Sequence, residues 1–163
     1  VSFATSLAMV ENRIFMGNGN IISLILQDEL LHKGWTAFLI NQVVKEDERF
    51  HSIQEECKDE VYALYMDVIR EEKEWADYLF QKGPVIGLNA NILKDFVDYT
   101  ALESLKAIGI KYNEPAPRVS PIPWFNKHSD TSKKQTALQE NESTNYVIGV
   151  MSESLDYDAL PEL

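Results

Sequence analysis

The sequence predicts an all-α protein, and three observations support this prediction. Apolar residues recur every three or four positions over most of the first 110 residues, which is the period of an amphipathic helix. No stretch alternates polar and apolar residues for long enough to predict a β-strand. Turn-forming compositions, GNGN at 17–20 and KGP at 82–84, divide the helical patterns into segments. We therefore expect a bundle of helices over residues 1–110.

Four helices are predicted in this bundle, over residues 1–16, 21–44, 46–80 and 91–108. The first ends at GNGN, and the third ends at KGP because proline cannot continue a helix. Asn89 or Asn91 is the expected cap of the fourth helix, since asparagine is favoured at that position. The second helix carries one stripe at helical spacing that we expect to face inward: Ile22, Ile25, Glu29, His32, Thr36 and Ile40.

Composition restricts the class of protein. The formal net charge of −11 argues against nucleic acid or an anionic membrane as the main partner, because both attract basic surfaces. The single cysteine, Cys57, excludes an internal disulfide and fits a reducing cytoplasm; we expect it to be a small core residue. No apolar run approaches the roughly 20 residues that span a bilayer, and no signal-peptide pattern opens the chain. A cytoplasmic protein is expected.

The last third of the chain differs in composition from the bundle. Four prolines interrupt residues 111–134, and SPIPWF (120–125) is expected to be an ordered, extended segment lying on the bundle. Residues 135–163 contain six acids and no basic residue, which favours a flexible tail. Because this tail keeps apolar residues such as Tyr146 and Leu163, we interpret it as a docking peptide that orders on a partner.

Glu29 and His32 are the candidate metal ligands. Residues three apart share a helix face, so the carboxylate and the imidazole point the same way. A buried carboxylate is costly unless a cation compensates it, and these two ligand types suit iron, manganese or zinc. Glu-x-x-His on an inward helix face is a unit of two-metal bundles. The alternative is an ordinary solvated helix face, on which this pattern also occurs.

Three further polar residues receive weaker interpretations. Asp28, next to Glu29, is either an acceptor that orients an imidazole or a surface acid. His51 and His128 lie in polar surroundings, and both are expected to be exposed.

Several motifs together identify a family resemblance. They are VSFATSLAMVENRIFMGNGNIISLILQDELLH (1–32), EEKEWADYLF (71–80), IGLN (86–89), PIPW (121–124) and NYVIG (145–149). In this order and spacing they resemble the small (beta, radical-generating) subunit of class I ribonucleotide reductase, of the bacterial and phage type. The resemblance implies a ferritin-like helical bundle with a di-iron centre beside a tyrosine that becomes a stable radical. The radical then passes to the large subunit, where ribonucleotides are reduced to deoxyribonucleotides.

The same resemblance implies roles for individual residues. Glu29 resembles the carboxylate that bridges the two irons, and His32 resembles a ligand of one iron, although manganese is also possible. Asp28 resembles the acid that hydrogen-bonds an iron-ligand histidine and a tryptophan on the electron path. Phe3 and Ile25 resemble the apolar wall of the radical pocket, which must keep out water and reductants.

The tail acquires a role by the same resemblance. Tyr146 resembles the tyrosine that carries the radical across the subunit interface, and Glu140 resembles a nearby acid that supports this proton-coupled step. The terminal ALPEL (159–163) resembles the peptide that docks the large subunit.

Of the family's metal ligands, only Glu29 and His32 are matched in this chain. The chain also opens at Val1 within an apolar helical pattern, so we expect it to be the C-terminal portion of a small subunit. A complementary N-terminal part would then complete the site, and the family's homodimer is expected. The alternative is a non-catalytic helical fragment that binds the large subunit through its C-terminal tail.

Overall fold

The computed structural model describes residues 1–130. Helices dominate this part of the chain, and it contains no β-strand, only one isolated bridge between Val85 and Leu88. The elements are α1 (Ser2–Glu11), α2 (Met16–Glu46), α3 (Glu48–Leu79), α4 (Ala90–Ala107), the 3-10 helix η1 (Pro123–Phe125) and α5 (Asn126–Ser129). The all-α prediction is confirmed, and the arrangement is consistent with a ferritin-like helical fold. None of these helices is long and apolar enough to cross a membrane.

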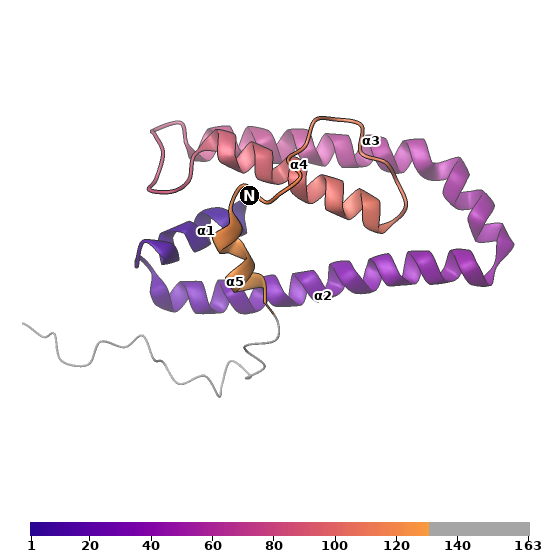
Figure 1. The fold of residues 1–163 in the computed structure, drawn as a ribbon, viewed down its shortest axis with the longest axis horizontal. Coiled ribbons are helices and arrows are strands. Elements are labelled where there is room, and N and C mark those ends of the chain that lie inside the picture. The colour runs from indigo at the N-terminus through magenta and orange to yellow at the C-terminus, as the bar shows by residue number, and fades with distance from the viewer. Residues whose placement is uncertain (131–163) are drawn as a thin grey trace, which may run out of the picture.

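The longest helices, α2 and α3, run antiparallel and are joined at Asp47 (Figure 1). Asp47 has an extended backbone (φ −141°, ψ 114°), which ends α2. Its side chain accepts a hydrogen bond of 2.9 Å from the backbone N–H of Arg49, which caps the start of α3. One residue therefore ends one long helix and begins the next.

The shorter helices pack on this pair. α4 lies along α3, while α1 and α5 contact α2 (Figure 1). One cluster of buried side chains joins α1, α2 and α4 to the residues around η1, and its most buried members include Leu7, Leu88, Leu93 and Ile122. A second cluster joins α3 to α4 and the residues that follow α4, including Ile69, Leu105 and Tyr112.

The turn predicted at residues 17–20 is wrong, because GNGN lies inside α2. α1 ends earlier, at Glu11, where the Asn12 side-chain amide donates hydrogen bonds to the carbonyls of Ala8 (2.7 Å) and Ile86 (3.1 Å). The chain reverses at Arg13 and Phe15, whose φ values of 61° and 55° lie in the left-handed region. These two residues, rather than the glycines, make the turn.

The predicted break at KGP and the predicted cap of the fourth helix are confirmed. α3 ends at Leu79, and Gly83 takes a φ of +120° that other residues rarely adopt. Asn89, rather than Asn91, caps α4, because its side-chain oxygen accepts a hydrogen bond of 2.9 Å from the N–H of Ile92.

The segment after α4 is held by a buried polar contact and then by apolar packing. The hydroxyl of Tyr112 donates a hydrogen bond of 2.5 Å to the carboxylate of Asp98, which also pairs with Lys73 at 2.7 Å. Ile122 and Phe125 are buried further along. The prediction of an extended SPIPWF segment is wrong at its end, because Pro123 begins the 3-10 helix η1, where its fixed φ and missing N–H are tolerated.

Candidate functional site

Glu29 and His32 lie near the middle of α2, on one face of the helix. Their spacing of three residues places Glu29 Oε2 3.6 Å from His32 Nδ1. The two side chains are 57% and 71% exposed. The predicted pairing on one face is therefore present, and both groups are open to solvent within the described part of the chain.

The expectation that this stripe of α2 points inward is wrong for its middle part, since Ile25, Glu29, His32 and Thr36 are exposed. Ile22 and Ile40, at its two ends, pack partly against the core clusters. Ile25 is 44% exposed, whereas its neighbour Leu26 is 5% exposed. Adjacent residues of a helix point about 100° apart, so at this level the face that carries Leu26, and not the face of Ile25, is turned toward the other described helices. Several apolar residues of α2 outside that face are also exposed: Ile21, Leu31, Trp35, Phe38 and Leu39. α2 thus has more apolar surface than these helices cover.

The described residues supply only part of a metal site. Asp28 is exposed beside Glu29, and within residues 1–130 no group of three or more His, Cys, Asp or Glu side chains is placed to hold a metal ion. A carboxylate and an imidazole are suitable donors for iron or manganese, but a protein site for these metals needs more ligands than two. The donor chemistry therefore fits half of a site.

A second Glu-x-x-His pattern, Glu48 to His51, begins α3. Both of its side chains are exposed, at the end of the helix next to the α2–α3 turn. The exposure predicted for His51 is confirmed, and this pattern has the character of a solvated helix face.

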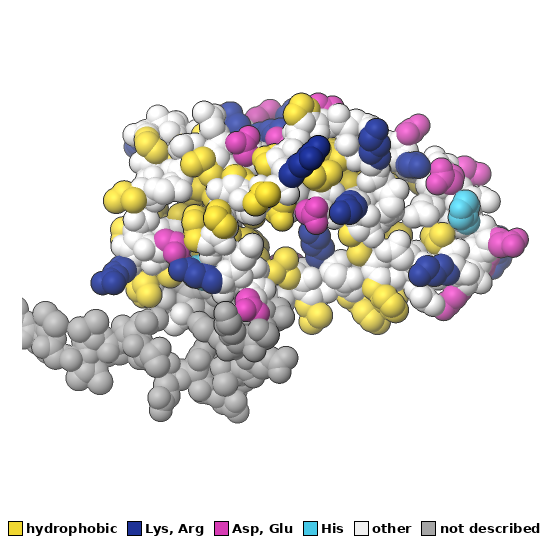
Figure 2. Space-filling view, viewed as in Figure 1, with side chains coloured by type: hydrophobic (Ala, Val, Ile, Leu, Met, Phe, Trp, Pro, Cys, Tyr) yellow, Lys and Arg dark blue, Asp and Glu magenta, His cyan; other side chains and the backbone are white. Residues whose placement is uncertain are grey.

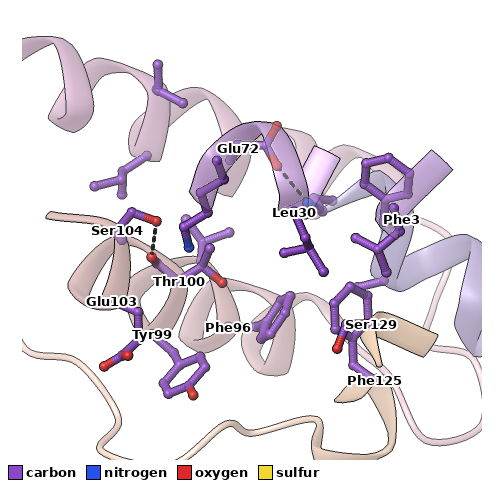
Figure 3. A pocket seen from close by; sticks show the side chains of 18 of the residues that line it. Phe3, Leu30, Glu72, Phe96, Tyr99, Thr100, Glu103, Ser104, Phe125 and Ser129 are labelled. Carbon is purple, nitrogen blue, oxygen red and sulfur yellow. Dashed lines mark hydrogen bonds and ion pairs between the residues drawn. The ribbon is translucent and has the colours of Figure 1, made fainter. Parts of the chain in front are cut away.

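A cavity of about 540 Å³ opens between α2 and the α3–α4 pair. Figure 2 shows hydrophobic side chains gathered around the hollow in this region. Its walls are mainly apolar and include Leu30, Phe96 and Phe125, with Glu72 and Glu103 among the polar groups (Figure 3). The Glu72 carboxylate accepts a hydrogen bond of 2.8 Å from the backbone nitrogen of Val1.

Phe3 and Ile25, which are predicted to share one apolar wall, do not both line this cavity. Phe3 lines the cavity (Figure 3), whereas Ile25 does not line it and is exposed on the face of α2 that carries Glu29. The cavity takes Leu26, Leu30 and Lys33 from α2. The cavity and the Glu29–His32 pair therefore lie on neighbouring faces of the same helix.

Comparison with known proteins shows which family the chain belongs to. Residues 1–117 match the family model described as ribonucleotide reductase, small chain. The chain belongs to this family. It is 40% identical over 162 residues to the ribonucleoside-diphosphate reductase 1 subunit beta of Salmonella typhimurium. The subunit beta of Haemophilus influenzae is 39% identical over 161 residues, and that of Enterobacteria phage T4 is 33% identical over 160 residues.

These alignments cover nearly all of this chain and less than half of each relative. The Salmonella protein is matched over 98% of this chain and 43% of its own length, and the phage T4 protein over 96% and 41%. The resemblance to the ribonucleotide reductase small chain is confirmed. The chain spans about two fifths of the length of these curated relatives.

The remaining residues singled out from the sequence have different outcomes. Tyr146 and Glu140 lie outside the described residues 1–130. Cys57 is only partly buried in α3. The prediction that His128 is exposed is wrong: its side chain is 13% exposed, because it packs between Glu11 and Ser23. Local sequence gave no signal of this contact, since Glu11 is 117 positions away.

Proposed function

We propose that this chain is the C-terminal portion of the small subunit of ribonucleoside-diphosphate reductase. It contributes Glu29 and His32 to a di-iron or manganese-containing site that other segments of the subunit complete. The observation that carries this proposal is the pairing of a carboxylate and an imidazole on one open face of α2, in a region that matches the family model. The curated relatives are named as beta subunits of this enzyme.

The surroundings of the pair support completion by another polypeptide segment. The exposed apolar residues of α2, such as Ile25 and Trp35, provide surface on which a further helix can pack. Such a helix would bring the missing ligands toward Glu29 and His32. We infer that a complementary N-terminal part of the subunit supplies it, and that the assembled subunit is a cytoplasmic homodimer.

In the completed site each residue of this chain has a limited task. Glu29 and His32 would hold the metal, and Asp28 would accept a hydrogen bond that orients a neighbouring imidazole. Phe3, and Ile25 once covered, would exclude water and reductants from the radical pocket. When bound, the metal centre supplies the one-electron oxidation that generates the radical.

The tail completes the proposal. Tyr146 would carry the radical toward the large subunit, because a phenol can lose a proton and an electron together. Glu140 would support the movement of the proton. The last residues of the tail would dock the large subunit as an apolar and acidic peptide.

Metal analysis of the reassembled subunit tests the proposal. The 163-residue chain is loaded anaerobically with Fe(II), alone and with the complementary part, and iron is quantified after desalting. We expect two irons per chain only in the assembled form. Tight binding of two irons by the chain alone would contradict the division of the ligand set.

A single substitution tests the role of the pair directly. Glu29→Ala removes one proposed ligand, so the radical yield of the reassembled subunit should fall to background. The matched control is Glu48→Ala, because Glu48 belongs to the other Glu-x-x-His pattern and is expected to leave the yield unchanged. Equal yields for both variants would favour a fragment that only binds the large subunit.

A further inference from the structure

A cluster of polar side chains lies where α1, α2 and α5 meet. His128 of α5 has its Nε2 atom 2.8 Å from Oε1 of Glu11 and its Nδ1 atom 3.2 Å from Oγ of Ser23. The Glu11 side chain is 25% exposed, and Ser23 is 5% exposed. One imidazole therefore bridges α1 and α2 from a helix that lies more than 100 positions away from both partners.

The partners decide which nitrogen of His128 carries a proton. The Glu11 carboxylate only accepts hydrogen bonds, and it already accepts one of 2.5 Å from Lys127. His128 must therefore donate from Nε2. The Ser23 hydroxyl can donate to Nδ1 of a neutral ring or accept from a protonated one. The bridge is satisfied in either charge state of the imidazole.

Further contacts hold the short segment that contains His128. This segment is residues 123–129, and we call it the strap. The Trp124 ring meets the His128 ring edge to face, with centroids 6.5 Å apart. Phe125 is buried, and the Gln27 side chain donates a hydrogen bond of 3.5 Å to the carbonyl of His128. The strap is fixed by the buried Phe125, by the His128 bridge and by the ion pair between Lys127 and Glu11.

Ser23, His128 and Glu11 are the residue types of a catalytic triad with a serine nucleophile. The burial of Ser23 excludes such a catalytic role. A nucleophile must reach its substrate, and Ser23 is enclosed between helices. The arrangement instead holds an element in place, since hydrogen bonds to a charged partner are among the stronger ones in proteins.

We propose that His128 is a positioning residue, which locks the strap onto α1 and α2 and so fixes the position of residue 130, the residue directly before residues 131–163. This inference rests on the proposed function, in which those residues dock the large subunit. Fixing the origin of a tethered peptide raises its effective concentration at a partner that also contacts the body of the protein. Loss of the lock should weaken association without changing the peptide itself.

The lock is tested first in the 163-residue chain by NMR of the imidazole nitrogens. The chain has three histidines, so variants at each assign the signals. We expect His128 to carry its proton at Nε2, and Ser23→Ala to shift the Nδ1 signal of His128 while the His51 signal stays in place. A His128 ring that shows an unbiased mixture of tautomers, unaffected by Ser23→Ala, would overturn the lock.

Hydrogen exchange measures how much the lock stabilises the strap against local opening. In His128→Ala, the backbone amides of residues 124–129 should exchange about tenfold faster, as expected for loss of a hydrogen bond to a charged group. His51→Ala is the matched control, because His51 is exposed. In this variant the strap should exchange at the wild-type rate. Unchanged exchange in His128→Ala would also overturn the proposal.

Association with the large subunit then tests the positioning role. The reassembled small subunit with His128→Ala should bind the large subunit several-fold more weakly, with unchanged radical content. His128→Gln keeps a donor toward Glu11 and should recover most of the affinity. A free peptide of residues 131–163 should displace the His128→Ala form from the large subunit at a lower concentration than the wild-type form, because the variant binds more weakly.

The outcomes separate this inference from the proposed function. If the wild-type subunit binds and His128→Ala binds equally well although its strap exchanges faster, only the positioning role is overturned. If the wild-type subunit does not bind the large subunit at all, the proposed function fails and the positioning role fails with it.

Discussion

Glu29 Oε2 and His32 Nδ1 lie 3.6 Å apart on α2, and neither side chain is buried by the described helices. An exposed pair of polar side chains one helical turn apart stabilises a protein by only a few tenths of a kcal/mol, about 0.3–0.5 kcal/mol at most even when both are charged. The pair is therefore not explained by the stability of this chain. Its open position instead suits residues whose partners come from another segment.

This view predicts that the pair is dispensable for folding. Glu29→Gln and His32→Ala should each change the free energy of unfolding of the 163-residue chain by less than about 0.5 kcal/mol. Urea denaturation followed by circular dichroism measures this. As a positive control, Leu93→Ala, in a fully buried position, should cost about 2–5 kcal/mol. A loss above about 1 kcal/mol at Glu29 would mean that it stabilises the chain directly.

A second prediction concerns Tyr146. Tyr146→Phe removes the phenolic proton but keeps the ring, so metal content and affinity for the large subunit should stay close to wild type while nucleotide reduction is lost. Turnover and iron content of the reassembled enzyme are measured together. Tyr157→Phe, elsewhere in the same tail, is the control. Persistent nucleotide reduction in Tyr146→Phe would refute the radical-relay role.

A third prediction follows from the buried contact between Tyr112 and Asp98. Burial, followed by the hydrogen bond to Asp98 and the nearby negative charge, raises the pKa of Tyr112 above its ordinary value of 10.0. Since the folded state then holds the phenolic proton more tightly than the unfolded state, the stabilisation is complete below pH 10 and decreases as the pH rises above it.

Tyr112→Phe should therefore have two effects. It should reduce the free energy of unfolding near neutral pH by about 1–2 kcal/mol, because the hydrogen bond to a charged partner is lost. It should also remove part of the loss of stability above pH 10. Tyr78→Phe is the control, since Tyr78 is 59% exposed. If both variants show the same alkaline decline, the Tyr112–Asp98 contact does not contribute to it.

The helical framework was predictable because its signals are local. Asn89 precedes the apolar pattern of α4 and caps it, and KGP stops α3, so both boundaries follow from neighbouring residues. The orientation of α2 was not predictable in the same way. Apolar residues such as Leu26 and Ile25 occur on more than one of its faces, and periodicity does not say which face this chain covers.

The candidate site shows the same division between local and distant information. The shared face of Glu29 and His32 follows from helix geometry alone. The partners of His128 do not, because Glu11 and Ser23 reach it only through the tertiary fold. A histidine in a polar sequence context is most simply expected to be exposed, and only packing against α1 and α2 makes it otherwise.

A fourth prediction uses the two glycines of GNGN, which the sequence favoured as a turn. A Cβ atom at Gly19 would overlap the side chain of Val10 in α1, whereas a Cβ atom at Gly17 would meet nothing within 4 Å. Val10 is β-branched and has little rotamer freedom in a helix, so it cannot move aside easily. The close approach of α1 and α2 therefore requires glycine at position 19. Unusual backbone angles are not the reason for this glycine.

The two positions form a matched pair for measurement. Gly19→Ala should destabilise the chain by about 1–3 kcal/mol through overpacking, while Gly17→Ala should stabilise it by up to about 1 kcal/mol through the better helix propensity of alanine. Urea denaturation of both variants gives the difference, and hydrogen exchange in α1 should increase only in Gly19→Ala. Since propensity acts in the same direction at both sites, any difference in sign reports the contact with Val10. Equal stabilisation by both substitutions would show that α1 and α2 do not approach this closely in solution.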